Sequence, residues 1–87
     1  MKSLQDEIDS IIDSLKQQRD ELRLQLQLGR NEVRSEWEEA ERKLDKIIGK
    51  ADAVRREMEV ASEDVLAAIK LSAEEIKRGY NRIRKVL

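Results

Sequence analysis

The sequence predicts an all-α protein, and three observations carry that prediction. Apolar or small residues recur at intervals of three, four or seven positions along the chain, which is the spacing of one face of a helix. The 87 residues include no proline that would interrupt a helix. Ala, Leu, Glu, Lys, Arg and Gln dominate the composition, and all of them favour helix. We therefore expect a single all-helical coiled-coil domain over residues 1–87.

The apolar positions form one stripe from end to end. Its members are Leu4, Ile8, Ile11, Leu15, Leu22, Leu26, Val33, Trp37, Ala40, Leu44, Ile47, Ala51, Val54, Met58, Ala61, Val65, Ile69, Ser72, Ile76, Tyr80, Ile83 and Leu87. Between Val33 and Val65 the spacing is a strict heptad, the repeat by which helices pack along an apolar seam. The residues expected to mediate self-association lie in the middle of this stripe: Trp37, Leu44, Ile47, Val54, Met58 and Val65. Trp37, the largest of them, is expected to be a core anchor.

One reversal of the chain is expected near Gly49. Gly49 follows Arg42 and Lys46, cations that suit the C-terminus of a helix, and Asp52 comes soon after as an N-cap for a second helix. A turn over residues 46–53 would make the fold an antiparallel helical hairpin.

The alternative is one long continuous helix in an antiparallel coiled coil. The heptad runs through Gly49 without a change of phase, which a continuous helix would require. Such a helix would be about 130 Å long at 1.5 Å per residue. Gly29 and Gly79 are weaker candidates for a break in the helix.

Charges beside the stripe favour antiparallel packing. In a parallel, in-register pair, Glu36 would face Glu41, and two cations would also meet. Antiparallel packing about the turn instead places Glu41 beside Arg55. It also brings the basic end of the chain alongside acidic residues near its beginning, such as Asp9.

Further apolar residues lie beside the stripe and widen it beyond a two-stranded seam. They are Ile12, Leu24, Leu28, Ile48, Val60, Leu66 and Leu71. A single hairpin would leave part of this surface exposed, so we expect two hairpins to dimerise into a four-helix bundle. Dimerisation would also compensate for the small core that so short a chain can bury.

The composition excludes several classes of chemistry. The chain has no histidine and no cysteine, so it lacks the commonest general base, thiolate nucleophiles, soft-metal ligands and disulfides. Acidic residues are abundant, but their pattern is that of a solvated helix face, and no calcium-loop or phosphate-loop motif is present. We therefore expect no catalytic residue, no metal, no cofactor and no enzymatic activity.

Charge is balanced over the whole chain but not along it. The sequence holds 18 basic and 19 acidic residues, which argues against binding of polyanions by bulk field. Residues 76–87, however, form a basic amphipathic C-terminal segment with five cations and no acid. The cations are Lys77, Arg78, Arg82, Arg84 and Lys85. They suit contact with an anionic membrane surface, a partner or nucleic acid, and they also suit the C-terminus of a helix, where the dipole favours cations.

The chain shows no membrane or secretion signal. The longest apolar run, Val65–Ile69, is too short to cross a bilayer, and the first residues lack the apolar stretch of a signal peptide. We expect a cytoplasmic protein.

Several segments resemble small bacterial coiled-coil proteins of unassigned function. They are Leu15–Leu26, Glu36-Trp37-Glu38, Ser62–Val65 and Glu74–Tyr80. The likeness covers most of the chain and implies a helical coiled coil. It brings no catalytic residues to transfer.

These observations predict a non-enzymatic scaffold or adaptor. We expect it to form a homo-oligomer, with a dimer favoured, and to be able to bind a protein partner. The alternative is a surface-binding module that uses the basic C-terminal segment on an anionic membrane or nucleic acid.

Overall fold

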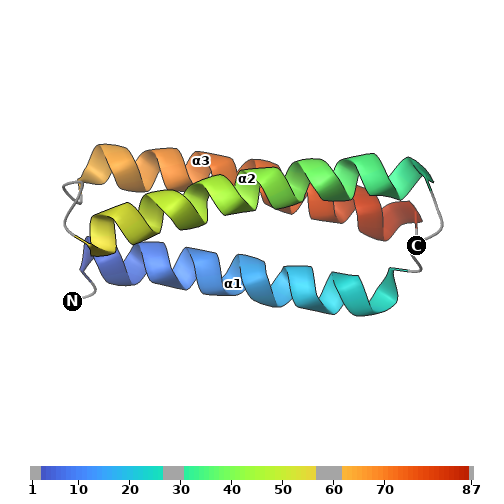
Figure 1. Ribbon diagram of the computed structural model, residues 1–87, viewed down its shortest axis with the longest axis horizontal. Coiled ribbons are helices and arrows are strands. Elements are labelled where there is room, and N and C mark those ends of the chain that lie inside the picture. The colour runs from blue at the N-terminus through green and yellow to red at the C-terminus, as the bar shows by residue number, and fades with distance from the viewer. Residues whose placement is uncertain (1–2, 27–30, 57–61, 87) are drawn as a thin grey trace.

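The computed structural model is a bundle of α-helices packed side by side (Figure 1). It describes residues 3–26, 31–56 and 62–86, and over these residues the chain forms three helices. Helix α1 spans Leu4–Gln25, α2 spans Asn31–Arg55 and α3 spans Glu63–Val86. Consecutive helices run antiparallel, so α1 and α3 are parallel to each other (Figure 1). The predicted all-α fold is confirmed.

The predicted turn near Gly49 is wrong, because residues 46–53 lie inside α2. Gly49 faces outward, and a glycine there costs the helix only about 1 kcal/mol relative to alanine, so α2 continues through it. The chain reverses instead between α1 and α2 and between α2 and α3, and Gly29, one of the weaker candidates, lies outside the described residues. The same two reversals exclude one continuous helix. Gly79, the other weak candidate, lies inside α3.

Side-chain caps mark where α1 and α3 begin. The backbone N–H of Asp6 donates to Ser3 Oγ (3.1 Å), and the backbone N–H of Val65 donates to Ser62 Oγ (3.2 Å). The Asp6 carboxylate in turn accepts from the backbone N–H of Ser3, which completes a capping box. Each such cap contributes about 1 kcal/mol to helix stability.

The core runs along the axis of the bundle and is filled mainly by the predicted stripe. Its buried apolar residues are Ile8, Ile12, Leu15, Leu22, Val33, Ala40, Leu44, Ile47, Ala51, Val54, Leu66, Ile69, Ala73, Ile76, Tyr80 and Ile83. Ile12 and Leu66 lie beside the stripe and are nevertheless buried, because a helix that packs against two neighbours needs a wider apolar face than a two-stranded seam. Leu24 and Leu71, also beside the stripe, point outward.

Ion pairs join the helices across the surface of the bundle. Arg55 of α2 pairs with Asp9 of α1, and Arg82 of α3 pairs with Glu36 of α2. The acidic beginning of α1 therefore meets the end of α2, and the predicted pairing with the basic C-terminal segment is wrong because α1 and α3 are parallel. Exposed pairs contribute only about 0.2–1 kcal/mol each, so they affect helix placement more than stability.

In the described part of the chain, no helix combines the length and apolar character needed to cross a membrane.

Candidate functional site

The residues predicted to mediate self-association lie in or against the core of a single chain. Leu44, Ile47 and Val54 are buried, and Trp37 and Val65 are partly buried and pack against the core. Met58 lies outside the described residues. The stripe is thus used to hold three helices of one chain together. Self-association through it stays a prediction, and it would require the bundle to open.

The two aromatic residues meet between α2 and α3. The ring centroids of Trp37 and Tyr80 are 6.1 Å apart, with the ring planes tilted by 35°. The guanidinium carbon of Arg23 in α1 lies 5.8 Å from the Trp37 ring centroid, within reach of a cation–π contact. Residues of all three helices therefore converge on Trp37, as an anchor of the bundle requires.

Two oxygen atoms near these rings, one from Tyr80 and one from Glu41, are buried. Tyr80 is fully buried, and its hydroxyl has no hydrogen-bond partner among the described residues. Glu41 Oε1 is also buried without a hydrogen bond there, and Arg23 Nη2 stands 3.8 Å from it. Burial, and then the charge of Glu41, raise the pKa of Tyr80 to about 12. Tyr80 is accordingly a neutral phenol at physiological pH.

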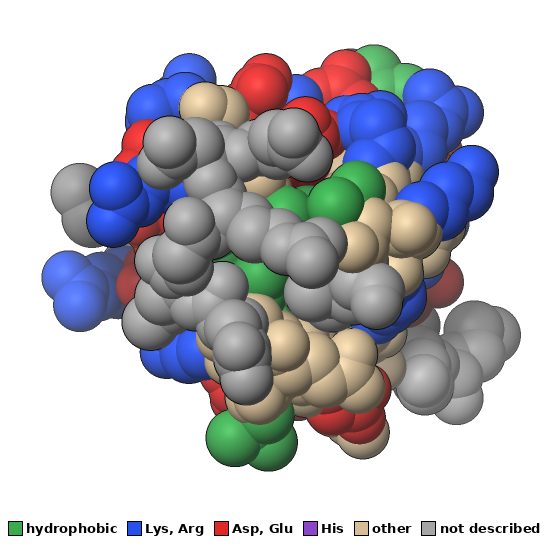
Figure 2. Space-filling view, turned by 90° about the vertical axis from the view of Figure 1, so that its right-hand side faces the viewer, with side chains coloured by type: hydrophobic (Ala, Val, Ile, Leu, Met, Phe, Trp, Pro, Cys, Tyr) green, Lys and Arg blue, Asp and Glu red, His purple; other side chains and the backbone are tan. Residues whose placement is uncertain are grey.

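The basic C-terminal segment lies along the last turns of α3. Lys77 is half-buried, whereas Arg78, Arg84 and Lys85 are exposed. Arg82, also exposed, is engaged by Glu36, and Arg84 Nη1 donates to Asn81 Oδ1 (3.0 Å). Figure 2 shows this end of the bundle, where lysine and arginine side chains surround the rim with acidic side chains among them.

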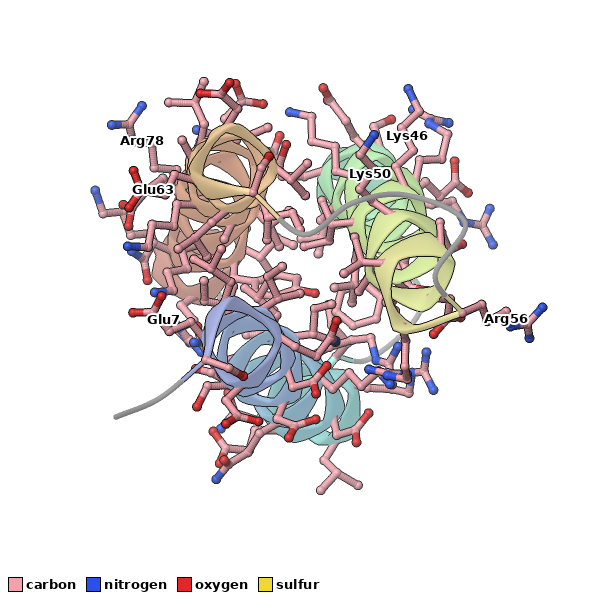
Figure 3. All side chains as sticks on the ribbon, turned by 90° about the vertical axis from the view of Figure 1, so that its left-hand side faces the viewer. Glu7, Lys46, Lys50, Arg56, Glu63 and Arg78 are labelled. Carbon is pink, nitrogen blue, oxygen red and sulfur yellow. The ribbon has the colours of Figure 1, made fainter. Side chains whose placement is uncertain are left out.

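Apolar side chains that are not part of the core lie on the outer face of α3. We define this face by Asp64, Ala67, Ala68, Leu71 and Arg78. Leu71 is 69% exposed, and Ala67 and Ala68 are exposed beside it. Asp64 precedes this apolar strip by one turn, and Arg78 lies two turns beyond Leu71, after the exposed Glu74 and after Glu75, which pairs with Lys43 of α2. Figure 3 shows Arg78 pointing away from the bundle.

A shallow open groove of about 340 Å³ lies next to this face, between α1 and α3. It is lined by Leu4, Glu7, Glu63, Leu66, Ala67 and Lys70. Figure 3 shows Glu7 and Glu63 on this flank of the bundle. The apolar surface of α3 thus continues from Ala67 toward α1.

The sequence predicted only part of this surface. Leu71 was expected to widen the apolar face, but Ala67 and Ala68 were not singled out. The signal lay in their spacing: Ala67, Ala68 and Leu71 share one side of α3, whereas Ile69, Ala73 and Ile76 share the opposite, buried side.

Within residues 3–26, 31–56 and 62–86, no three side chains of the metal-binding types are grouped so that they could hold a metal ion.

Comparisons with protein-family models, with curated proteins and with solved structures gave no match to this chain. The resemblance to small bacterial coiled-coil proteins therefore stays a prediction.

Proposed function

We propose that this chain is a non-enzymatic interaction module, a scaffold or adaptor that self-associates through outward side chains while its own core stays closed. The observation that carries the proposal is the exposure of Leu71, with Ala67 and Ala68 beside it, on a bundle whose stripe is already buried. Leu24, 89% exposed, lies on another helix, α1, and is not part of this surface.

Physical size supports the same proposal. A domain of this length buries a smaller fraction of its surface than larger domains do, so additional burial between copies brings a useful gain in stability. Clustered apolar side chains on the surface of a small protein are typical of sites where another molecule binds, whereas single exposed ones are common. The cytoplasmic location expected from the sequence belongs to this proposal.

Sedimentation equilibrium over a wide range of protein concentrations tests the proposal. The weight-average mass should rise from one chain toward two as concentration increases, because association follows mass action. A mass of 10.2 kDa at every concentration would reject self-association.

A second candidate function is binding of an anionic surface by the basic C-terminal segment. It is favoured by the outward placement of Arg78, Arg84 and Lys85 on α3. Flotation with phosphatidylcholine vesicles, with and without phosphatidylserine, and a mobility-shift assay with duplex DNA at two salt concentrations test it. Binding that requires anionic lipid or DNA and weakens with salt would support this function, and no binding at low salt would reject it.

A further inference from the structure

The outer face of α3 has opposite charges placed symmetrically about Leu71. Asp64 lies seven residues before Leu71, and Arg78 lies seven residues after it. Because seven residues are close to two helical turns, all three side chains share one side of α3. All three are exposed, with Ala67 and Ala68 filling the space between Asp64 and Leu71.

Neither Asp64 nor Arg78 makes an ion pair within the described part of the chain. Arg82, one turn further along α3, is by contrast held by Glu36. Figure 3 shows Arg78 extending away from the bundle. A charge in this position can meet an opposite charge on another molecule without breaking a contact of its own chain.

We propose that this face binds the same face of a second copy, with α3 packed antiparallel against the partner's α3 and Leu71 at the two-fold axis. The inference rests on the proposed self-association and adds its surface and geometry. In this arrangement Asp64 of each chain lies opposite the partner's Arg78, so one dimer contains two such contacts. A parallel pair would oppose Asp64 to the partner's Asp64, which is repulsive.

The side chains around Leu71 fit the same arrangement. Lys70 precedes Leu71 by one residue and Glu74 follows it by three, and both are exposed. Lys70 also lines the groove toward α1, and Glu74 lies one turn after it on α3. The two-fold axis places Lys70 of each chain within one turn of the partner's Glu74. The small side chains of Ala67 and Ala68 allow the two helices to approach closely.

Charge exchange between two variants tests this geometry. We expect Asp64→Arg alone, and Arg78→Asp alone, each to weaken the dimer about tenfold, because each variant creates two like-charge contacts per dimer. An equimolar mixture of the two single variants should recover dissociation close to that of the wild type, because both contacts are again between opposite charges. Sedimentation equilibrium of the wild type, of each variant and of the mixture measures this.

Both the mixture and the single variants have an outcome that contradicts the proposed register. A mixture that associates no more tightly than either variant alone would overturn the proposed register. Single variants that associate as tightly as the wild type would overturn it as well.

Two matched leucine substitutions test the surface itself. Leu71→Glu should abolish dimerisation over the measured concentrations, whereas Leu24→Glu, on the outer side of α1, should leave it unchanged. Circular dichroism melts verify that both variants stay folded, as expected for outward positions. If the wild type dimerises and Leu71→Glu dimerises as tightly, the proposed surface is wrong, but self-association itself is not contradicted. A wild type that is monomeric at every concentration would reject both.

Discussion

The inner and outer sides of α3 carry similar apolar side chains with opposite environments. On the inner side, Ile69, Ile76 and Tyr80 are buried against the other two helices. On the outer side, Leu71 stands in solvent with two alanines. The difference shows how three helices divide an apolar surface. The arc that faces the two neighbouring helices becomes core, and apolar residues beyond that arc remain exposed to solvent in the single chain.

Truncation of an apolar side chain to alanine should cost far more stability on the inner side of α3 than on the outer side. Ile76→Ala should lower the free energy of unfolding by about 2–5 kcal/mol, because it removes a fully buried side chain and leaves a cavity. Leu71→Ala should change it by less than about 0.5 kcal/mol in dilute solution, because the side chain is already hydrated. Urea unfolding followed by circular dichroism measures both. Equal losses would show that Leu71 is buried in the monomer, against the distinction drawn between the two sides.

The second prediction concerns pH and the buried phenol on the inner side. The pKa of an unfolded tyrosine is about 10, and burial raises the pKa of Tyr80 in the native protein to about 12. Between these values the native state binds more protons than the unfolded state, so stability falls as pH rises. The contribution of the neutral phenol is complete below pH 10, and roughly 2–3 kcal/mol of it is lost by pH 12.

Tyr80→Phe isolates this contribution. Lysines and the other groups that titrate at high pH are present in both proteins, so the difference between the two stability curves is due to Tyr80. The phenylalanine variant should be at least as stable as the wild type near neutral pH, because the hydroxyl that it removes has no hydrogen-bond partner among the described residues. It should then lose less stability than the wild type on titration from about pH 9 to about pH 12. Parallel curves for the two proteins would mean that Tyr80 is accessible to water.

A smaller effect is expected on the outer side of α2. Gly49→Ala should raise stability by about 1 kcal/mol, because alanine favours helix and its Cβ would have free space. Gly79→Ala is the matched control inside α3, where the added Cβ would make ordinary contacts of 3.7–3.9 Å with Glu36, Arg82 and Ala40. Thermal melts measure both. A loss of stability in Gly49→Ala alone would indicate a turn at that glycine.

Local sequence rules predicted the all-helical state and most of the core, but not the number of helices. Spacing in threes and fours selects the buried side of each helix, because packing of that side is the dominant favourable term in folding. The capping box at Ser3 could not be selected in this way, because Ser14, Ser35 and Ser72 also have an acidic residue or glutamine three positions on.

The positions of the reversals could not be predicted in the same way. The heptad keeps its phase from Val33 to Val65, although α2 ends at Arg55 and α3 begins at Glu63. The stretch between them contains neither glycine nor proline, so turn chemistry gave no signal. The usable signal was Ser62, an N-cap followed by two acidic residues in the first turn of α3. Gly49 was a stronger candidate by composition alone, but its effect on an outward helix position is small.

The candidate interaction surface was only partly predictable for a related reason. Leu66 and Leu71 are equally apolar and both lie off the stripe, yet Leu66, which borders the stripe, is buried, and Leu71, on the opposite side of α3, is exposed. The number of neighbouring helices and their directions decide between these outcomes. Those properties follow from the chain reversals, which the periodicity does not mark.

Small-angle X-ray scattering, at a concentration where sedimentation shows a monomer, tests most directly whether one chain closes into a three-helix bundle. Three helices closed within one chain predict a radius of gyration near 14.0 Å and a longest dimension near 41 Å before side chains and hydration are added. A hairpin of two helices would give about 65 Å, and a single continuous helix about 130 Å, at 1.5 Å per residue. Either of these longer dimensions in the monomer would contradict the closed bundle.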